Sequence, residues 1–105
     1  MKEYQVIITP DAEQDLYELS DYITITLCTP MAARRIIHSI RSYILKLSFS
    51  PKRYHLMDDE PWHSRRVRRM NVENFAVFFL VNDALLKVYI QNVIYQGRDI
   101  TSILS

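Results

Sequence analysis

The chain has 105 residues, of which 49% are hydrophobic, so residues 1–105 suffice for one compact domain with its own core and are too few for two. The longest apolar run, residues 75–81, is far shorter than the roughly 20 residues of a membrane-spanning helix, and we expect a soluble, cytoplasmic protein. Cys28 is the single cysteine, which excludes an internal disulfide, and His38, His55 and His63 lack metal-binding spacing. We expect neither a metal nor a cofactor.

Charge is unevenly distributed along the chain, although the formal net charge is only +1. Residues 1–30 contain one base and six acids, whereas residues 31–72 contain ten bases and three acids. This separation predicts one acidic face and one basic face, and the basic face suits a polyanion or an acidic protein partner.

The first half predicts a short strand followed by a helix hairpin. A strand over residues 4–9 leads into Thr9-Pro10-Asp11, a helix start with a capping hydroxyl, a proline at the first position and an acid at the positive dipole end. Thr29-Pro30 repeats this signal, so we expect one helix from Pro10 to about Leu27 and a second from Pro30 that Phe49-Ser50-Pro51 ends, folded back on each other. Their predicted apolar faces are Ala12, Leu16, Leu19 and Ile23, and Ala33, Ile37, Ile40, Ile44 and Leu47.

The second half predicts a polar loop over residues 52–64 and an antiparallel sheet. Strands are expected over about residues 66–72, 74–81 and 85–95, with a turn at Asn82-Asp83. The fold class is therefore α+β, with the helix hairpin packed on a mainly antiparallel sheet. The middle strand is apolar on both faces, so we expect something beyond the hairpin, such as a bound partner, to cover its second face.

The arginines Arg65, Arg66, Arg68 and Arg69 form the most basic stretch of the chain. Together with bases of the second helix, they predict a surface for phosphate groups of a nucleic acid. An equally good interpretation is a solvated strand face, and a basic patch alone supplies affinity without sequence specificity.

Tyr95 and Arg98 lie at the end of the last predicted strand and in the turn after it. A tyrosine hydroxyl and a guanidinium are suited to activate an RNA 2′-hydroxyl and to stabilise the phosphorane formed during transfer. The alternative for Tyr95 is packing against the sheet edge, and for Arg98 an ion pair with Asp99. His63 is interpreted as a loop histidine.

Several segments stand in a characteristic order and spacing along the chain. They are Thr9-Pro10-Asp11-Ala12, Asp15-Leu16, residues 30–33, residues 47–51, Arg69-Met70-Asn71-Val72-Glu73-Asn74-Phe75, Val77-Phe78-Phe79 and residues 93–99. Their order and spacing resemble the RelE/ParE superfamily of bacterial toxin components, and the resemblance covers nearly the whole chain.

The resemblance implies a small toxin that is held inactive in a hetero-oligomer with a cognate antitoxin. RelE-like members cut messenger RNA on the ribosome without a metal, whereas ParE-like members inhibit DNA gyrase. If this chain is such a nuclease, we expect Arg68 or Arg69 to bind the phosphate, Arg98 to stabilise the transition state and Tyr95 to position or accept a proton.

The chain departs from the RelE-like pattern at two positions. Asn71 stands where those nucleases tend to place a catalytic arginine, with Arg69 two residues earlier on the same face, and Thr101 falls near their late tyrosine. We expect ribosome-associated mRNA cleavage, with gyrase inhibition carrying nearly equal weight. An inactive homologue that only binds its antitoxin is the third alternative.

Overall fold

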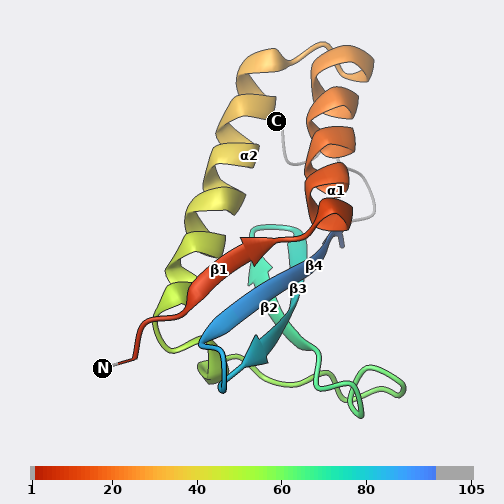
Figure 1. Cartoon of the computed structure of the whole chain (residues 1–105). Coiled ribbons are helices and arrows are strands. Elements are labelled where there is room, and N and C mark those ends of the chain that lie inside the picture. The colour runs from red at the N-terminus through yellow and green to blue at the C-terminus, as the bar shows by residue number, and fades with distance from the viewer. Residues whose placement is uncertain (1, 97–105) are drawn as a thin grey trace.

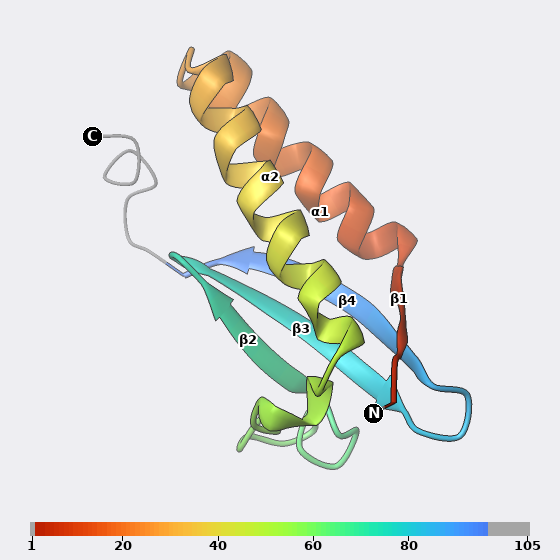
Figure 2. The ribbon, with the colours of Figure 1, turned by 90° about the vertical axis from the view of Figure 1, so that its left-hand side faces the viewer.

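The helix hairpin lies on one face of a four-stranded sheet in the computed structural model, which describes residues 2–96 (Figures 1 and 2). The sheet order is β1-β4-β3-β2, with β1 parallel to β4 and the other neighbours antiparallel. This arrangement confirms the predicted α+β class. The elements are β1 (Gln5–Ile8), α1 (Pro10–Asp21), α2 (Pro30–Leu45), β2 (Arg68–Val72), β3 (Phe75–Asn82) and β4 (Lys87–Tyr95).

Both helices begin at the predicted prolines. The Thr9 hydroxyl accepts a hydrogen bond from the Ala12 amide at 3.3 Å and so caps α1. Beyond Asp21 the chain continues as a π-helical segment, η1 (Tyr22–Thr26), so helical structure extends almost to the predicted end. Thr29 does not cap α2, because its hydroxyl instead donates to the Ile23 carbonyl at 3.1 Å.

The core lies between the hairpin and the sheet and contains no charged or polar side chain among the described residues. On α2 the sequence placed Ile37 on the apolar face, but Ile37 is only half-buried, and its neighbour Ile36 is buried in its place beside Ala33, Ile40 and Ile44. The other predicted positions are buried or packed against the core. The fully enclosed side chains include Leu16, Ile23, Ile36, Ile40, Ile44, Met70, Phe75, Val77, Phe79, Val88 and Ile90.

Two irregularities in the last hairpin differ from the prediction. The β3–β4 turn is longer than the predicted Asn82-Asp83, because β3 ends at Asn82 and β4 begins only at Lys87. Within the turn, the Asn82 side chain accepts a hydrogen bond from the Leu85 amide at 2.9 Å. The β3–β4 register also shifts between Phe78, which pairs with Asn92, and Phe79, which pairs with Ile90. Gln91 is therefore the extra residue of a β-bulge.

The bulge is tied to α1 by an acidic side chain. Asp15 accepts hydrogen bonds from the Val93 amide at 2.9 Å and from the Asn92 side-chain amide at 3.1 Å. On this side of β4 the pairing with β1 stops at Ile90, and beyond that point the carboxylate of Asp15 takes the place of a strand partner for the Val93 amide.

Candidate functional site

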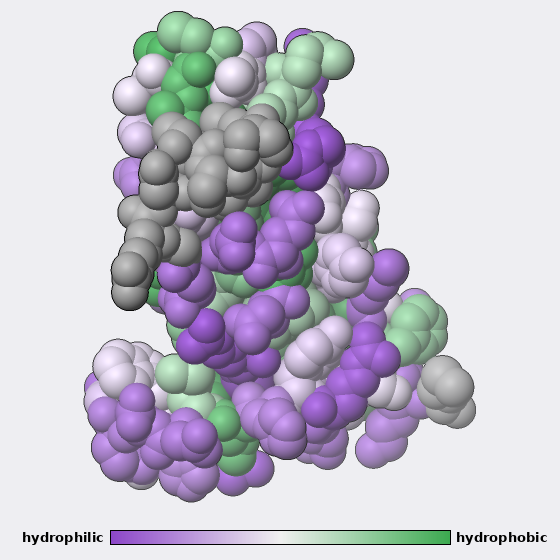
Figure 3. All heavy atoms as spheres, turned by 180° about the vertical axis from the view of Figure 1, so that it is seen from behind, coloured by the Kyte–Doolittle hydropathy of each residue, from purple (hydrophilic) through white to green (hydrophobic). Residues whose placement is uncertain are grey.

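A cleft of about 450 Å³ lies on the face of the sheet opposite to the helices. Because Val77 and Phe79 of β3 point into the core, the alternate residues Phe78 and Leu80 point to the other face and line the cleft. Figure 3 shows the molecule from this rear side, where hydrophilic residues surround smaller hydrophobic areas.

The loop before β2 forms one wall of the cleft. Its position is set by hydrogen bonds from the Met57 amide to the Val67 carbonyl at 2.8 Å and from the Val67 amide to the Trp62 carbonyl at 3.0 Å. Met57, Trp62 and Val67 all line the cleft, so the chain itself covers part of the second apolar face of β3. Trp62 remains 46% exposed and is available to a ligand.

Arg69 extends from β2 across the floor of the cleft. Its Nε donates to the Asn71 side-chain oxygen at 2.9 Å, and its Nη2 donates to the Gln96 side-chain oxygen at 2.7 Å. The guanidinium carbon lies 5.9 Å from the centre of the Phe78 ring, within the range of a cation–π contact. Two amides and one ring therefore hold the guanidinium in place.

The four arginines predicted as one basic surface are divided between different sites. Arg65 lines the same cleft as Arg69 and also a neighbouring depression beside Asn82, which Arg66, with a φ of 61°, lines without reaching the cleft. Arg68 lies on the helix side of β2, where its Nη1 donates to the carbonyls of Tyr54 at 2.7 Å and Lys52 at 3.3 Å. Burial, assisted by the nearby charge of Arg66, lowers the pKa of Arg68.

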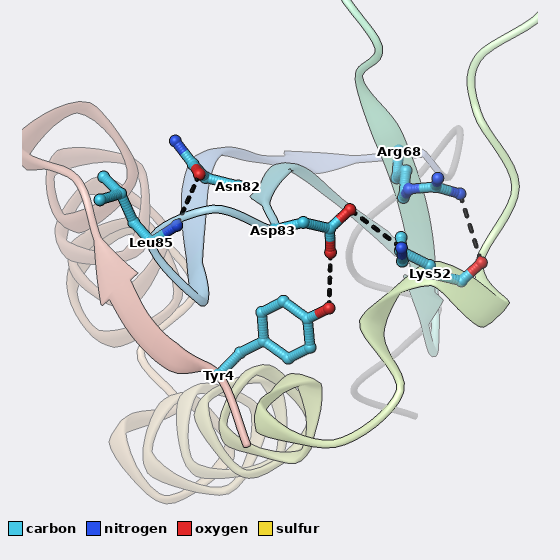
Figure 4. Close-up of polar contacts among 6 residues, drawn as sticks. All are labelled: Tyr4, Lys52, Arg68, Asn82, Asp83 and Leu85. Atoms are coloured by element: carbon cyan, nitrogen blue, oxygen red, sulfur yellow. Dashed lines mark hydrogen bonds and ion pairs between the residues drawn. The ribbon is translucent and has the colours of Figure 1, made fainter. Parts of the chain in front are cut away.

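Figure 4 shows Arg68 beside a second polar cluster that joins three distant segments. The carboxylate of Asp83 accepts a hydrogen bond from the Tyr4 hydroxyl at 2.6 Å and pairs with the Lys52 ammonium at 2.9 Å. The hydrogen bond from Tyr4 lowers the pKa of Asp83 most, and the hydrogen bond from Lys52 lowers it further. The same contact with Asp83, together with burial, raises the pKa of Tyr4.

Tyr95 lies on the opposite face of the sheet from Arg69. Its ring packs 5.4 Å from the buried ring of Phe75, and its hydroxyl is buried without a hydrogen-bond partner in the described part of the chain. The bulge at Gln91 explains this placement, because one extra residue shifts the inward-facing positions from Val88 and Ile90 to Val93 and Tyr95. The structure therefore does not bring Tyr95 together with Arg69, and Arg98 lies outside the described residues.

Several polar residues of the cleft had no place in the sequence-based site. Gln91, Asn92 and Gln96 line it together with Arg69, and Asn71 binds the guanidinium. Spacing along β2 relates Arg69 to Asn71. The contact of Arg69 with Gln96 depends on the order of the strands and on the bulge, which no local pattern indicates.

The cleft combines cations, amides and apolar surface. Its described lining contains no carboxylate and no histidine, so this part of it holds no side chain with the usual pKa of a general base. His63 is a loop residue, with Nδ1 at 2.9 Å from the Met57 carbonyl. The arrangement is suited to binding an acidic or polar partner that also offers an apolar side chain.

Two searches for further sites were negative within residues 2–96. No cluster of three or more His, Cys, Asp or Glu side chains in this range could hold a metal ion. No described helix is both long and apolar enough to cross a membrane.

A family model described as the ParE toxin of the type II toxin–antitoxin system parDE matches residues 6–100. No curated protein sequence matches the chain significantly. Among solved structures, the chromosomal ParDE system of P. aeruginosa is similar, with 19% identity, a TM-score of 0.74, and coverage of 90% of this chain and 98% of that chain.

Two further structures share the fold. The toxin–antitoxin complex RelBE2 from Mycobacterium tuberculosis has 20% identity and a TM-score of 0.67, covering 89% of this chain and 98% of that chain. The archaeal RelE–RelB complex from Pyrococcus horikoshii OT3 has 16% identity and a TM-score of 0.55, covering 92% and 99%.

Proposed function

Because this chain belongs to the ParE toxin family of type II toxin–antitoxin systems, we propose that it stops bacterial growth by inhibiting DNA gyrase and is neutralised by a cognate antitoxin. Gyrase inhibition is the activity that the resemblance to ParE-like members implies. The antitoxin partner is supported by the similar structures, of which the one from Mycobacterium tuberculosis is described as a toxin–antitoxin complex and the one from Pyrococcus horikoshii OT3 as a RelE–RelB complex.

The observation that carries the choice of target is the separation of Arg69 from Tyr95. A ribonuclease of the expected kind needs a group for proton transfer next to the cation that binds the phosphate. Tyr95 packs on the helix side of the sheet, whereas Arg69 lies in the cleft on the other side. This geometry favours a toxin that acts by binding a protein.

The composition of the cleft supports the same conclusion. Tryptophan and arginine are the residues most enriched among the energetic centres of protein interfaces, and Trp62, Arg65 and Arg69 line one depression. We assign this cleft to the contact with gyrase, with the two arginines steering the approach of an acidic surface.

Messenger RNA cleavage on the ribosome is the second candidate. Two arginines and two aromatic side chains around one cleft also suit a phosphate and a stacked base of single-stranded RNA. In that case Arg69 would bind the phosphate. Stabilisation of the transition state by Arg98 and proton transfer by Tyr95 stay predictions.

Pulse-labelling of DNA and protein synthesis, immediately after the chain is induced without an antitoxin, separates the candidates. We expect DNA synthesis to stop first, with a damage response, while translation continues. An immediate stop in translation would instead favour mRNA cleavage, and normal synthesis of both would indicate a homologue without toxicity.

A supercoiling assay with purified gyrase then tests the cleft. We expect Arg65→Glu/Arg69→Glu to require a roughly tenfold higher toxin concentration for half-maximal inhibition, as is typical of interface centres. Lys2→Glu/Lys46→Glu is the matched control, because it changes the charge equally at two exposed positions outside the cleft. Equal inhibition by both double variants would exclude the cleft from the contact with gyrase.

A further inference from the structure

The two helices of the hairpin carry opposite charges. The α1 helix contains Asp11, Glu13, Asp15, Glu18 and Asp21 and no basic residue, whereas α2 contains Arg34, Arg35, His38 and Arg41 and no acidic residue. Asp15 is used internally, at the bulge of β4. The remaining acids of α1 are exposed to solvent.

No described segment covers the face of the hairpin that points away from the sheet (Figure 2). On α1 this face carries Glu13, Tyr17 and Asp21 at four-residue spacing. On α2 it carries Arg34, Ile37 and Arg41.

These residues form three levels along the antiparallel helices. At the first level, Arg41 pairs with Glu13 at 2.9 Å, and at the second, Tyr17 and Ile37 line one groove. Helical spacing places Asp21 and Arg34 at the third level. Within residues 2–96 neither of these two has an ion-pair partner.

We propose that this outer face binds a second copy of the same chain about a two-fold axis parallel to the helices. Such an axis places α1 of each copy against α2 of the other, so an acidic helix meets a basic helix in both halves of the interface. A two-fold axis across the helices would place α1 on α1, which like charges disfavour. Charge therefore selects one orientation, a four-helix arrangement of two hairpins.

The centre of the interface is a reciprocal contact of Tyr17. This side chain is 66% exposed, at the edge of a groove of about 540 Å³ that Leu16, Ile37 and Arg41 also line. Two-fold symmetry carries Tyr17 of each copy to the groove of the other, where its ring gains apolar contact with the half-buried Ile37. Asp21 then faces the partner's Arg34, and Glu13 faces the partner's Arg41.

Analytical ultracentrifugation of the full chain over a range of concentrations tests the proposal. We expect a monomer–dimer equilibrium that weakens as salt is added, because ion pairs flank the contact. Tyr17→Ala should raise the dissociation constant at least about tenfold, as loss of a central tyrosine does in protein interfaces. A species that stays monomeric at every concentration in low salt would overturn the proposal.

Charge reversal tests the orientation of the two copies. Asp21→Arg and Arg34→Glu should each abolish dimerisation, since each places like charges at the third level. The double variant Asp21→Arg/Arg34→Glu should restore it, because acid and base again face each other. Dimerisation that survives both single changes would contradict the assigned face.

Two controls complete the experiment. Arg65→Glu makes the same charge change on the opposite side of the sheet and should leave the dimer unchanged. Circular dichroism and thermal unfolding of every variant establish that the chain is folded, so a misfolded single variant is recognised as such. Restored dimerisation of the double variant then shows that Asp21 of one copy faces Arg34 of the other.

Discussion

At the scale of single residues, the carboxylate of Asp83 joins three parts of the chain that are far apart in sequence. It binds Tyr4, ahead of β1, and Lys52, in η3 (Pro51–Arg53), while Asp83 itself follows β3. Both partners favour the ionised carboxylate, which is why the pKa of Asp83 is lowered in the folded protein. Ionisation of Asp83 and folding are therefore linked.

Asp83→Asn should lower the free energy of unfolding slightly at neutral pH and not at all in strong acid. A carboxyl group with a lowered folded pKa stabilises the protein above its unfolded pKa, and this stabilisation disappears as the pH falls through the folded pKa. Urea unfolding of both proteins across this acidic range measures the difference. A difference that persists in acid would mean that charge is not its cause, and Asp58→Asn is the control at an exposed position.

Among the elements, α2 shows what a helical pattern leaves undetermined. Ile36 and Ile37 both fit the apolar face, because steps of three and four residues are both compatible with a period of 3.6. The rotation of α2 against the sheet decides between them, and it buries Ile36 while leaving Ile37 at the groove beside α1. Local sequence thus predicts the helix and its approximate face, but not this rotation.

Ile36→Ala should cost about 2–5 kcal/mol of unfolding free energy, as a fully enclosed isoleucine does when it leaves a cavity. Ile37→Ala should cost clearly less, because a half-buried side chain loses less contact. Urea unfolding at low protein concentration compares the two variants. Equal losses would contradict the rotation of α2 described above.

The candidate site was harder to predict than the helices and strands. Arg65 and Arg66 precede β2, and Arg66 has positive φ, so strand alternation cannot relate them to Arg68 and Arg69. Alternation would also place Tyr95 on the same face as Tyr89, but the bulge reverses the faces after Gln91. The residue types thus predicted a basic, aromatic site. Which of these residues share the site depends on the positive φ of Arg66 and on the bulge of β4, which the sequence pattern does not indicate.

At the scale of the whole molecule, Asp15 connects the hairpin to the sheet. Its carboxylate holds the bulge of β4, and the residues of that bulge, Gln91 and Asn92, line the cleft. The acidic helix on one side of the sheet thereby supports the shape of the candidate site on the other.

Asp15→Ala should lower the free energy of unfolding by about 1–3 kcal/mol, because the Val93 amide loses its acceptor. Amide hydrogen exchange at Val93 should accelerate beyond the change expected from global stability alone. Glu18→Ala, on the exposed side of the same helix, is the control. Unchanged protection at Val93 would show that another group satisfies this amide.

The parallel pairing of β1 with β4 joins the first strand to the last one described. A nascent chain emerges in order, so β1 and the hairpin leave the ribosome long before the strand that completes their sheet. Contacts between such distant segments form late, since a long loop must close first. The cleft should consequently form only once β4 has been synthesised, so under the proposed function the emerging polypeptide cannot yet bind its target while β1 and the hairpin are already exposed.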